Sequence, residues 1–392
     1  MKLIKQRLRT QTIAALLLSL SAGPLIAADV TGARLNIGSF HTLTGSSSSI
    51  AGGDANTVNS LDSIIGAGEN NIINSGAGDS FLGGGFENVI SSDYCAIGGG
   101  YINVIDTASQ ASFIGGGAQH YLQAVYGTIA GGGYNAVLAY GGTIGGGVLN
   151  VIHTNADYAF IGGGKGNVVS ALAEYSSISG GDTNSIGRHA EYSYIGNGEN
   201  NTNEASFAYL GGGLKNFVGT NATYGSLVGG LSNQVTAARA TVPGGEGAKA
   251  ANHGQLAYAS GIFGAVGDAQ SSLYVLRGTT ANATQTEIFL DGSALRAAVP
   301  SGATWTFEVH IVGRSSGGSS AGYRTKGVIE NVSGTTALVG TAPIETIAED
   351  VAGWDAAVQA DNTNDALVVK VTGAASTNIR WVATIRTVEV TY

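Results

Sequence analysis

Aliphatic residues recur along the middle of the chain with only two spacings. Taking the first aliphatic residue of each repeat as its anchor, Ile, Leu or Val stands at thirteen positions from Ile50 to Val242, and consecutive anchors are 15 or 17 residues apart. Adding two residues to an extended chain keeps every side chain on its own face, whereas adding one would reverse all the faces. The spacing therefore predicts short strands joined by turns, with one coil of a parallel β-solenoid in each repeat.

Further columns of the repeat support this interpretation. A second aliphatic column lies eight residues after the anchors, and we expect the two columns to form the core. The residue three after each anchor is always Gly, as expected where the backbone takes positive φ or passes close to another chain. Six residues after the anchor every copy has Asn except at His120 and Ala248, and Asn side chains can bond from coil to coil. The predicted ladder includes Asn71, Asn88, Asn103, Asn135, Asn150, Asn167, Asn184 and Asn216.

Aromatic residues gather one and three positions before the anchors, and parity turns them away from the core. Two roles remain open for them. They form either a stacked ladder that pads the sheet or a subunit interface, or a row of platforms for a ligand such as a glycan. The ligand-binding candidates in this column are Tyr158, Tyr175, Tyr192 and Tyr224.

Residues 257–392 show a different pattern, in which longer alternating runs are separated by Gly, Ser, Asn or Asp. This predicts an antiparallel β-sandwich or jelly roll. It holds all three tryptophans, of which Trp354 is the candidate for an exposed sugar-binding ring because Asp350 and Asp355 indicate a loop around it. The predicted organisation is a signal peptide at 1–27, a lead-in strand or cap at 28–49, solenoid repeats at 50–256 and this C-terminal domain.

The first residues have the order of a secretory signal peptide: four cations up to Arg9, an apolar run over 12–20, and a small-residue site after which cleavage at Ala27 is expected. We therefore expect a secreted or cell-surface protein. Cleavage would change the formal net charge from −9 to −13, which argues against a nucleic-acid partner. No later segment is apolar enough for a transmembrane helix. Cys95 is the single cysteine and occupies a column of small residues, where a buried filler is expected.

The sequence offers no recognisable catalytic constellation. The acidic residues Asp54, Glu69, Asp182 and Glu199 recur at one turn position, which is typical of solvated turns and not of a paired acid and base. The six His residues have no metal-ligand spacing, and no glycine triplet ends in the Lys-Ser/Thr that grips phosphate. We therefore expect no catalytic residues, no metal, no cofactor and no enzymatic activity.

From Ile50 to about residue 250 the Ile-Gly-Gly-Gly-x-x-Asn units resemble the heads of YadA-type trimeric autotransporter adhesins, although these coils are slightly longer and a coiled-coil stalk is missing. The resemblance implies a left-handed parallel β-roll with three chains side by side. The segment from His253 to Gln270 and the final strand are similar to a terminal domain of phage tail-fibre-like and bacterial surface proteins. That similarity implies a fibre tip or a trimerising cap.

Together these observations favour a secreted or cell-surface fibre, structural or adhesin-like, whose partners are further copies of itself in a homotrimer and a cell-surface glycan or matrix. The first alternative is a phage tail-fibre or receptor-binding protein, against which the signal peptide counts. A weaker alternative is a polysaccharide-degrading solenoid enzyme.

Overall fold

The computed structural model describes residues 35–392, which form two units, one up to Val137 and one from Leu138 to Tyr392. The predicted signal peptide lies outside the described residues. Every regular element described is a β-strand, and no helix in the described part of the chain is long and apolar enough to cross a membrane.

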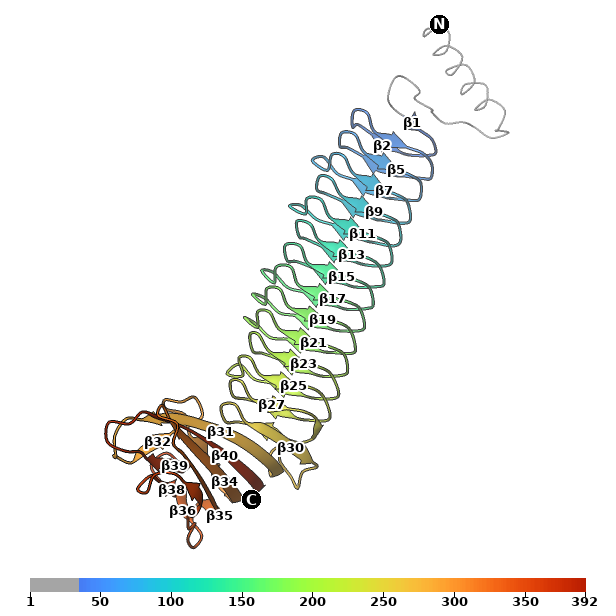
Figure 1. Ribbon diagram of the computed structural model, residues 1–392. Helices are drawn as coiled ribbons and strands as arrows, with labels where there is room; N and C mark the ends of the chain where they lie inside the picture. Colours follow the sequence, from blue (N-terminus) through green and yellow to red (C-terminus); the bar gives the residue numbers. More distant parts are fainter. Residues whose placement is uncertain (1–34) are drawn as a thin grey trace. The chain divides into compact units, whose positions relative to one another are not determined.

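The first unit is a parallel β-solenoid in which each coil adds one two-residue strand to each of two sheets (Figure 1). The strands at the anchors are β1 (Leu35–Asn36), β3 (Ser49–Ile50), β5 (Ile64–Ile65), β7 (Phe81–Leu82), β9 (Ala96–Ile97), β11 (Phe113–Ile114) and β13 (Thr128–Ile129). Those of the second column are β2 (Thr42–Leu43), β4 (Thr57–Val58), β6 (Ile72–Ile73), β8 (Val89–Ile90), β10 (Val104–Ile105), β12 (Tyr121–Leu122) and β14 (Ala136–Val137).

The second unit begins with the same kind of coil. Its anchor strands are β15 (Thr143–Ile144), β17 (Phe160–Ile161), β19 (Ser177–Ile178), β21 (Tyr194–Ile195), β23 (Tyr209–Leu210), β25 (Ser226–Leu227) and β27 (Thr241–Val242). The second sheet holds β16 (Val151–Ile152), β18 (Val168–Val169), β20 (Ser185–Ile186), β22 (Thr202–Asn203), β24 (Phe217–Val218), β26 (Gln234–Val235) and β29 (Lys249–Ala250), while β28 (Gly245–Glu246) lies in the turn between β27 and β29.

The strand registers reproduce the two spacings of the sequence. Ser49 pairs with Ile64, 15 residues on, and Ile64 pairs with Phe81, 17 residues on. The two additional residues lie in the turn after the second strand, so they disturb neither sheet. The solenoid also starts earlier than residue 50, because Leu35 already pairs in parallel with Ser49. The prediction of a parallel β-solenoid is confirmed.

The interior of each coil contains the two aliphatic columns and the asparagines. The anchors and their second-column partners are fully buried, as in Ile161 and Val169. The predicted ladder asparagines are buried as well, and Asn167 Nδ2 donates to Asn150 Oδ1 at 3.1 Å and to the carbonyl of Gly181 at 3.0 Å. A buried amide with both ends bonded avoids the cost of an unsatisfied polar group. The same turn requires glycine at Gly181, where φ is +96° and a Cβ would overlap the carbonyl oxygen of Gly198.

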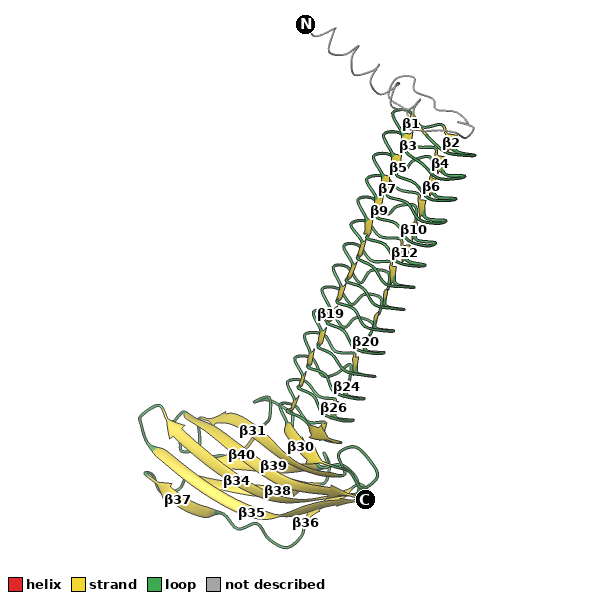
Figure 2. Cartoon of the chain, turned by 90° about the vertical axis from the view of Figure 1, so that its right-hand side faces the viewer, coloured by secondary structure: helices red, strands yellow, loops and turns green. Residues whose placement is uncertain are grey.

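The C-terminal domain is a sandwich of two antiparallel sheets (Figure 2). The larger one pairs β30 (Leu256–Ser260), β31 (Ala269–Thr280), β40 (Ile379–Thr391), β34 (Ala303–Ser315), β35 (Ser320–Val332) and β37 (Glu345–Glu349) in that order, with β36 (Thr335–Leu338) also on β35. In the smaller sheet β39 (Ala366–Thr372) pairs with β38 (Asp355–Asp361), β32 (Thr286–Ile288) and β33 (Ala297–Ala298). The prediction of an antiparallel β domain is confirmed, and β30 joins it to the solenoid by pairing in parallel with β27 and antiparallel with β31.

The tryptophans form part of the core between the two sheets. Trp354 is only 4% exposed and its ring packs edge-on against Trp381 at 5.6 Å between centroids. The prediction of Trp354 as an exposed sugar-binding ring is therefore wrong. The acidic residues on either side of it do mark a loop, but the ring turns inward because it completes the apolar core.

Candidate functional site

Six aromatic rings form a stacked row along the solenoid of the second unit. We call this row the tyrosine ladder; its members are Tyr140, Tyr158, Tyr175, Tyr192, Phe207 and Tyr224. From Tyr158 to Tyr224 neighbouring ring centroids are 5.0–5.3 Å apart with interplanar angles of 7–25°, and these five rings are each about half exposed. The structure thus brings together the four tyrosines taken as ligand-binding candidates.

The ladder residues occupy an unusual backbone conformation. Tyr158, Tyr175, Tyr192 and Tyr224 have φ between 54° and 60°, in the left-handed region. For a residue with a Cβ this costs roughly 1–2 kcal/mol relative to a right-handed conformation. The left-handed turn recurs at this position in other coils whatever residue fills it, as at Asp79, Ala111 and Gly141.

Stacking and burial offset the strain. An offset-stacked aromatic pair contributes about 0.5–1.5 kcal/mol beyond its buried area. The buried half of each ring adds roughly 25 cal/mol for each Å² of apolar surface removed from water. The tyrosines therefore stabilise this position in spite of its backbone conformation.

The orientation of the rings decides what the ladder can bind. Because each ring lies against the next, its two faces are covered, and the ring edges and the phenol hydroxyls are what the ladder presents to solvent. The hydroxyls of Tyr175, Tyr192 and Tyr224 make no hydrogen bond within the described part of this unit. At one end the guanidinium of Arg239 lies 5.6 Å from the centre of the Tyr224 ring. Of the two roles left open by the sequence, the structure has the stacked ladder and not the row of open ring platforms, and its hydroxyls line one edge with a gap at Phe207.

A second exposed column lies directly before the anchors. It includes Phe160, Tyr209 and Leu256, each 40–44% exposed, and Tyr209 stacks on Tyr194 with centroids 5.4 Å apart. Tyr194 also shares a hydrogen bond of 2.8 Å with the hydroxyl of Ser179. This column faces outward from the anchor sheet, and between the large apolar side chains it holds Thr143, Ser177, Ser226 and Thr241.

Several glycines that follow the anchors are not required by the coil. At Gly52, Gly131, Gly163 and Gly229, each two residues after an anchor, φ is outside the left-handed region and an added Cβ would lie at least 3.7 Å from the nearest atom beyond the chain neighbours. Neither strain nor lack of space therefore requires glycine there. A side-chain-free strip lets another surface approach the backbone closely.

The acidic residues singled out in the sequence lie in pairs on neighbouring coils. Asp54 pairs with Glu69 in the first unit, and Asp182 pairs with Glu199 in the second. The backbones of neighbouring parallel strands are about 4.8 Å apart, so the two carboxylates of each pair start from adjacent coils. None of these residues lines the four best-formed hollows of residues 35–392. Among residues 35–392 no cluster of acidic, His or Cys side chains could hold a metal.

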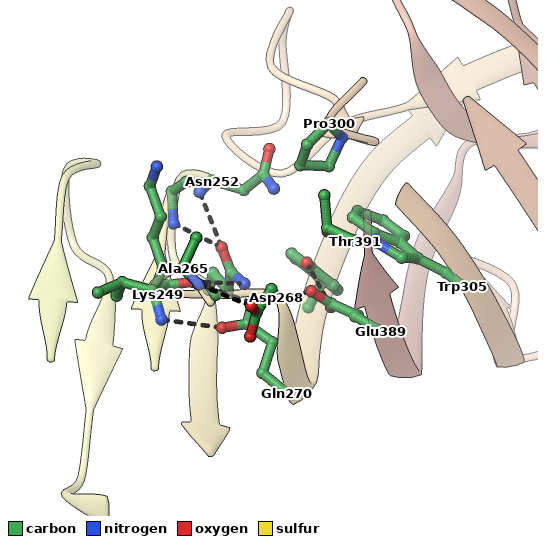
Figure 3. Close-up of a pocket in the computed structure, with 14 residues that line it drawn as sticks. Lys249, Asn252, Ala265, Asp268, Gln270, Pro300, Trp305, Glu389 and Thr391 are labelled. Atoms are coloured by element: carbon green, nitrogen blue, oxygen red, sulfur yellow. Dashed lines mark hydrogen bonds between the residues drawn. The ribbon is translucent and has the colours of Figure 1, made fainter. Parts of the chain in front are cut away.

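A cavity of about 160 Å³ lies where the last coil meets the C-terminal domain (Figure 3). Glu389 of β40 is 5% exposed there and accepts hydrogen bonds from Gln270 Nε2 at 2.8 Å, from the Tyr274 hydroxyl at 3.1 Å and from the Thr387 hydroxyl. Burial and the nearby Glu389 carboxylate raise the pKa of the Tyr274 phenol, so it remains a donor. Three donors stabilise the buried carboxyl, which we interpret as structural.

Comparison with known proteins identifies no family for this chain. No protein-family model matches it, and no curated protein matches it. Among solved structures it is similar to the tailspike protein gp49 of Acinetobacter baumannii bacteriophage Fri1, a capsular polysaccharide depolymerase, at 10% identity over 86% of this chain and 70% of that one, with a TM-score of 0.20. It is also similar to the tailspike protein of Acinetobacter phage vB_ApiP_P1, at 9% identity over 93% and 77% of the two chains, with a TM-score of 0.23.

These comparisons change one of the predictions. The expectation of a protein without enzymatic activity is contradicted, because the gp49 tailspike is a depolymerase. TM-scores near 0.2 assign no reaction, ligand or residue role to this chain.

Proposed function

We propose that this protein is a fibre protein of the tail-fibre or surface-adhesin type that binds a polysaccharide along its tyrosine ladder. The observation that carries the proposal is the row of half-exposed tyrosines whose hydroxyls, at Tyr175, Tyr192 and Tyr224, make no hydrogen bond within the described part of the second unit. A polymer of repeating units can meet such a row at several points at once, and linked contacts of modest strength add to high avidity.

A variant that removes the hydroxyls but keeps the rings tests this proposal. Phe207 already occupies one step of the ladder, with its ring centroid 5.0 Å from that of Tyr192, so phenylalanine fits the stack. We expect the triple variant Y175F/Y192F/Y224F to lose about tenfold or more in polysaccharide affinity, since each lost hydrogen bond contributes about 0.5–1.5 kcal/mol. The matched control is Y209F, in the other aromatic column. The measurement is binding of the full chains to a panel of bacterial capsular polysaccharides; equal affinity of the triple variant and the wild type would refute a role for the hydroxyls.

The same experiment reports on cleavage. Counting reducing ends of the bound polysaccharide over time separates a fibre that only binds from one that also degrades its ligand. If ends accumulate, the double variant D182N/E199Q asks whether the adjacent carboxylates of the second unit carry the reaction.

We also propose that three chains associate along the solenoid. The exposed side chains of Phe160, Tyr209 and Leu256 and the glycines that the coil does not require support this proposal, because close packing of another chain explains both features. Light scattering after gel filtration should give a particle of about three times the 39.3 kDa chain mass, reduced by the signal peptide where it has been removed. In G163V/G229V the fold should remain while the assembly weakens. A monomeric wild type would contradict the proposal.

The proposed location is the outside of the cell, reached through the N-terminal signal. Export distinguishes the adhesin-like fibre from the tail fibre, because a phage fibre assembles in the cytoplasm. Mass spectrometry of the exported chain should show a new N-terminus at Ala28; an uncleaved chain retained in the cell favours the tail-fibre alternative.

A further inference from the structure

Two arginines stand directly opposite one another at one end of the larger sheet in the C-terminal domain. Arg314 of β34 pairs with Arg380 of β40, and both side chains are exposed on the outer face of the sheet, away from the core. Thr279 of β31 pairs with Arg380 on its other side, so the row crosses three neighbouring strands (Figure 2). Like charges directly opposite one another destabilise a sheet.

No acidic side chain in the described structure compensates this pair. Neither arginine has a carboxylate within 4.0 Å, and Arg314 donates only to the Ser320 hydroxyl, at 3.2 Å. Asp350 forms no ion pair with either arginine, and its carboxylate accepts the backbone N–H of Ser320 at 2.8 Å. Other cations of the same face are matched: Arg324 forms an ion pair with Glu345 at 2.8 Å.

The arginine pair lines a hollow of about 660 Å³, whose other walls are mostly small polar residues. Thr279, Ser316 and Asn378 contribute hydroxyl and amide groups, and their side chains make no hydrogen bond within residues 138–392. The volume is in the range of sites that hold a small organic ligand, and an inorganic ion would fill only a small part of it.

We propose that this hollow binds a sugar unit that carries a carboxylate, such as a uronic acid of an acidic polysaccharide. The two guanidinium groups bind the carboxylate, since arginine offers paired N–H donors in the geometry of a carboxylate fork. The hydroxyl and amide groups around them bind the sugar hydroxyls. The site goes beyond the proposed function: it lies on another domain than the tyrosine ladder and requires a charged ligand, which the ladder does not.

Calorimetric titration of the full chain at low salt tests the site, with trigalacturonate as the probe and the neutral maltotriose and inorganic sulfate as comparisons. We expect binding of trigalacturonate only, and a loss of roughly 10- to 100-fold in R380Q and in R314Q, the effect of one charged hydrogen-bonded contact. The matched control is R386Q, which removes a cation from the same strand and face but opposite Glu308. Y175F/Y192F/Y224F should bind trigalacturonate as the wild type does, which separates this site from the ladder.

Thermal unfolding of the unliganded variants supplies a second readout. R380Q should melt at a higher temperature than the wild type because it removes a repulsion, whereas an arginine with a structural role would lower the melting temperature when replaced. Equal binding of trigalacturonate by R380Q and the wild type, equal binding of maltotriose, or binding of sulfate alone would each overturn the proposal.

Discussion

The side-chain amide of Gln270 bonds the backbone of Lys249 in the way that a further coil would. Lys249 N–H donates to Gln270 Oε1 at 2.8 Å, and Gln270 Nε2 donates to the Lys249 carbonyl at 3.0 Å. Lys249 belongs to β29, the last strand of its sheet, where unpaired backbone groups would otherwise remain. Gln255 does the same for Ala251 and Asn252, whose N–H groups donate to its Oε1 at 2.8 and 2.9 Å. Side chains thus cover a strand edge of the kind that promotes aggregation.

Replacing Gln270 with Leu should destabilise the junction between the solenoid and the C-terminal domain. The change leaves the Lys249 N–H unpaired, leaves the Lys249 carbonyl with only the 3.4 Å hydrogen bond from Gln255 Nε2, and removes a donor from the buried carboxylate of Glu389, at about 1–3 kcal/mol for each unsatisfied group. Urea unfolding should show a loss of about 3 kcal/mol or more, with increased aggregation near the midpoint. The control Q359L alters an exposed glutamine of β38. If both variants unfold at the same urea concentration, the Gln270 amide does not cap the edge.

His120 interrupts the asparagine ladder, and its replacement with Asn should stabilise the protein. The ring Nδ1 accepts the N–H of Asn135 at 3.2 Å, but the buried Nε2 has no partner. An asparagine at this position can accept the backbone N–H of the next ladder asparagine with its Oδ1 and donate its Nδ2 to the Oδ1 of the preceding one, as Asn150 and Asn167 do. We expect a gain of about 1–2 kcal/mol in the free energy of unfolding at pH 8.

The advantage of H120N should grow in acid. Burial lowers the pKa of the His120 imidazole in the folded state below its ordinary value of about 6.5. The unfolded chain therefore binds a proton first, and wild-type stability falls as the pH drops below about 6.5 toward the folded-state pKa. Asn does not titrate, so the difference between the two proteins should widen from pH 8 to pH 5. A difference that is constant with pH would show that burial does not lower the pKa of His120.

The spacing of the aliphatic anchors and the alternation of side chains between the two faces of a strand were sufficient to predict the solenoid, because each coil repeats the same local environment. The same signals failed for Trp354, which lies outside any repeat and whose position depends on packing against Trp381. Strand β38 carries only a weak sequence signal, since Val358 is the one β-branched residue in its Asp-Ala-Ala-Val-Gln-Ala-Asp sequence and no aromatic residue stands there. Glu389 could have been found: parity in the last strand places it on the inward face with Trp381 and Ile385.

The tyrosine ladder was only half predictable, for a physical reason. Parity turns residues such as Tyr192 away from the core, as observed, but it treats the segment as extended strand. The left-handed turn at this position is set by the return of the chain to the next anchor, so the ring stacking follows from the turn and not from the strand. The pattern of apolar residues in the sequence carries no signal for this left-handed turn.

Backbone strain at Tyr192 can be measured by comparing two replacements. Both Y192A and Y192G lose the stacking on Tyr175 and Phe207, but only alanine keeps a Cβ in the left-handed region. We expect Y192G to be more stable than Y192A by about 1 kcal/mol in chemical unfolding, although glycine is usually the less stable of the two in extended or helical segments. A more stable Y192A would mean that the turn is not strained.

Cys95 should be inert in the folded protein. The thiol is 1% exposed, its sulfur donates to the carbonyl of Ser109 at 3.1 Å, and its N–H donates to the Ser80 hydroxyl. Burial raises the pKa of the thiol, which lowers the fraction of reactive thiolate. Ellman's reagent at pH 8 should therefore label the folded protein only at the rate of unfolding. Labelling should be complete in roughly 6 M guanidinium, which lies above the midpoint of about 5 M that marks the most stable domains.

The variant C95S is the structural counterpart of that experiment. The same position in the adjoining coils holds Ser80 and Ser112, so a serine hydroxyl can make the hydrogen bond that the thiol makes, and Ser112 Oγ donates to the Ala124 carbonyl at 2.6 Å. We expect the free energy of unfolding to change by less than about 0.5 kcal/mol. Rapid labelling of the folded wild type, or a large loss of stability in C95S, would show that this position is more than a small buried filler, because a reactive thiol needs access and a stabilised thiolate.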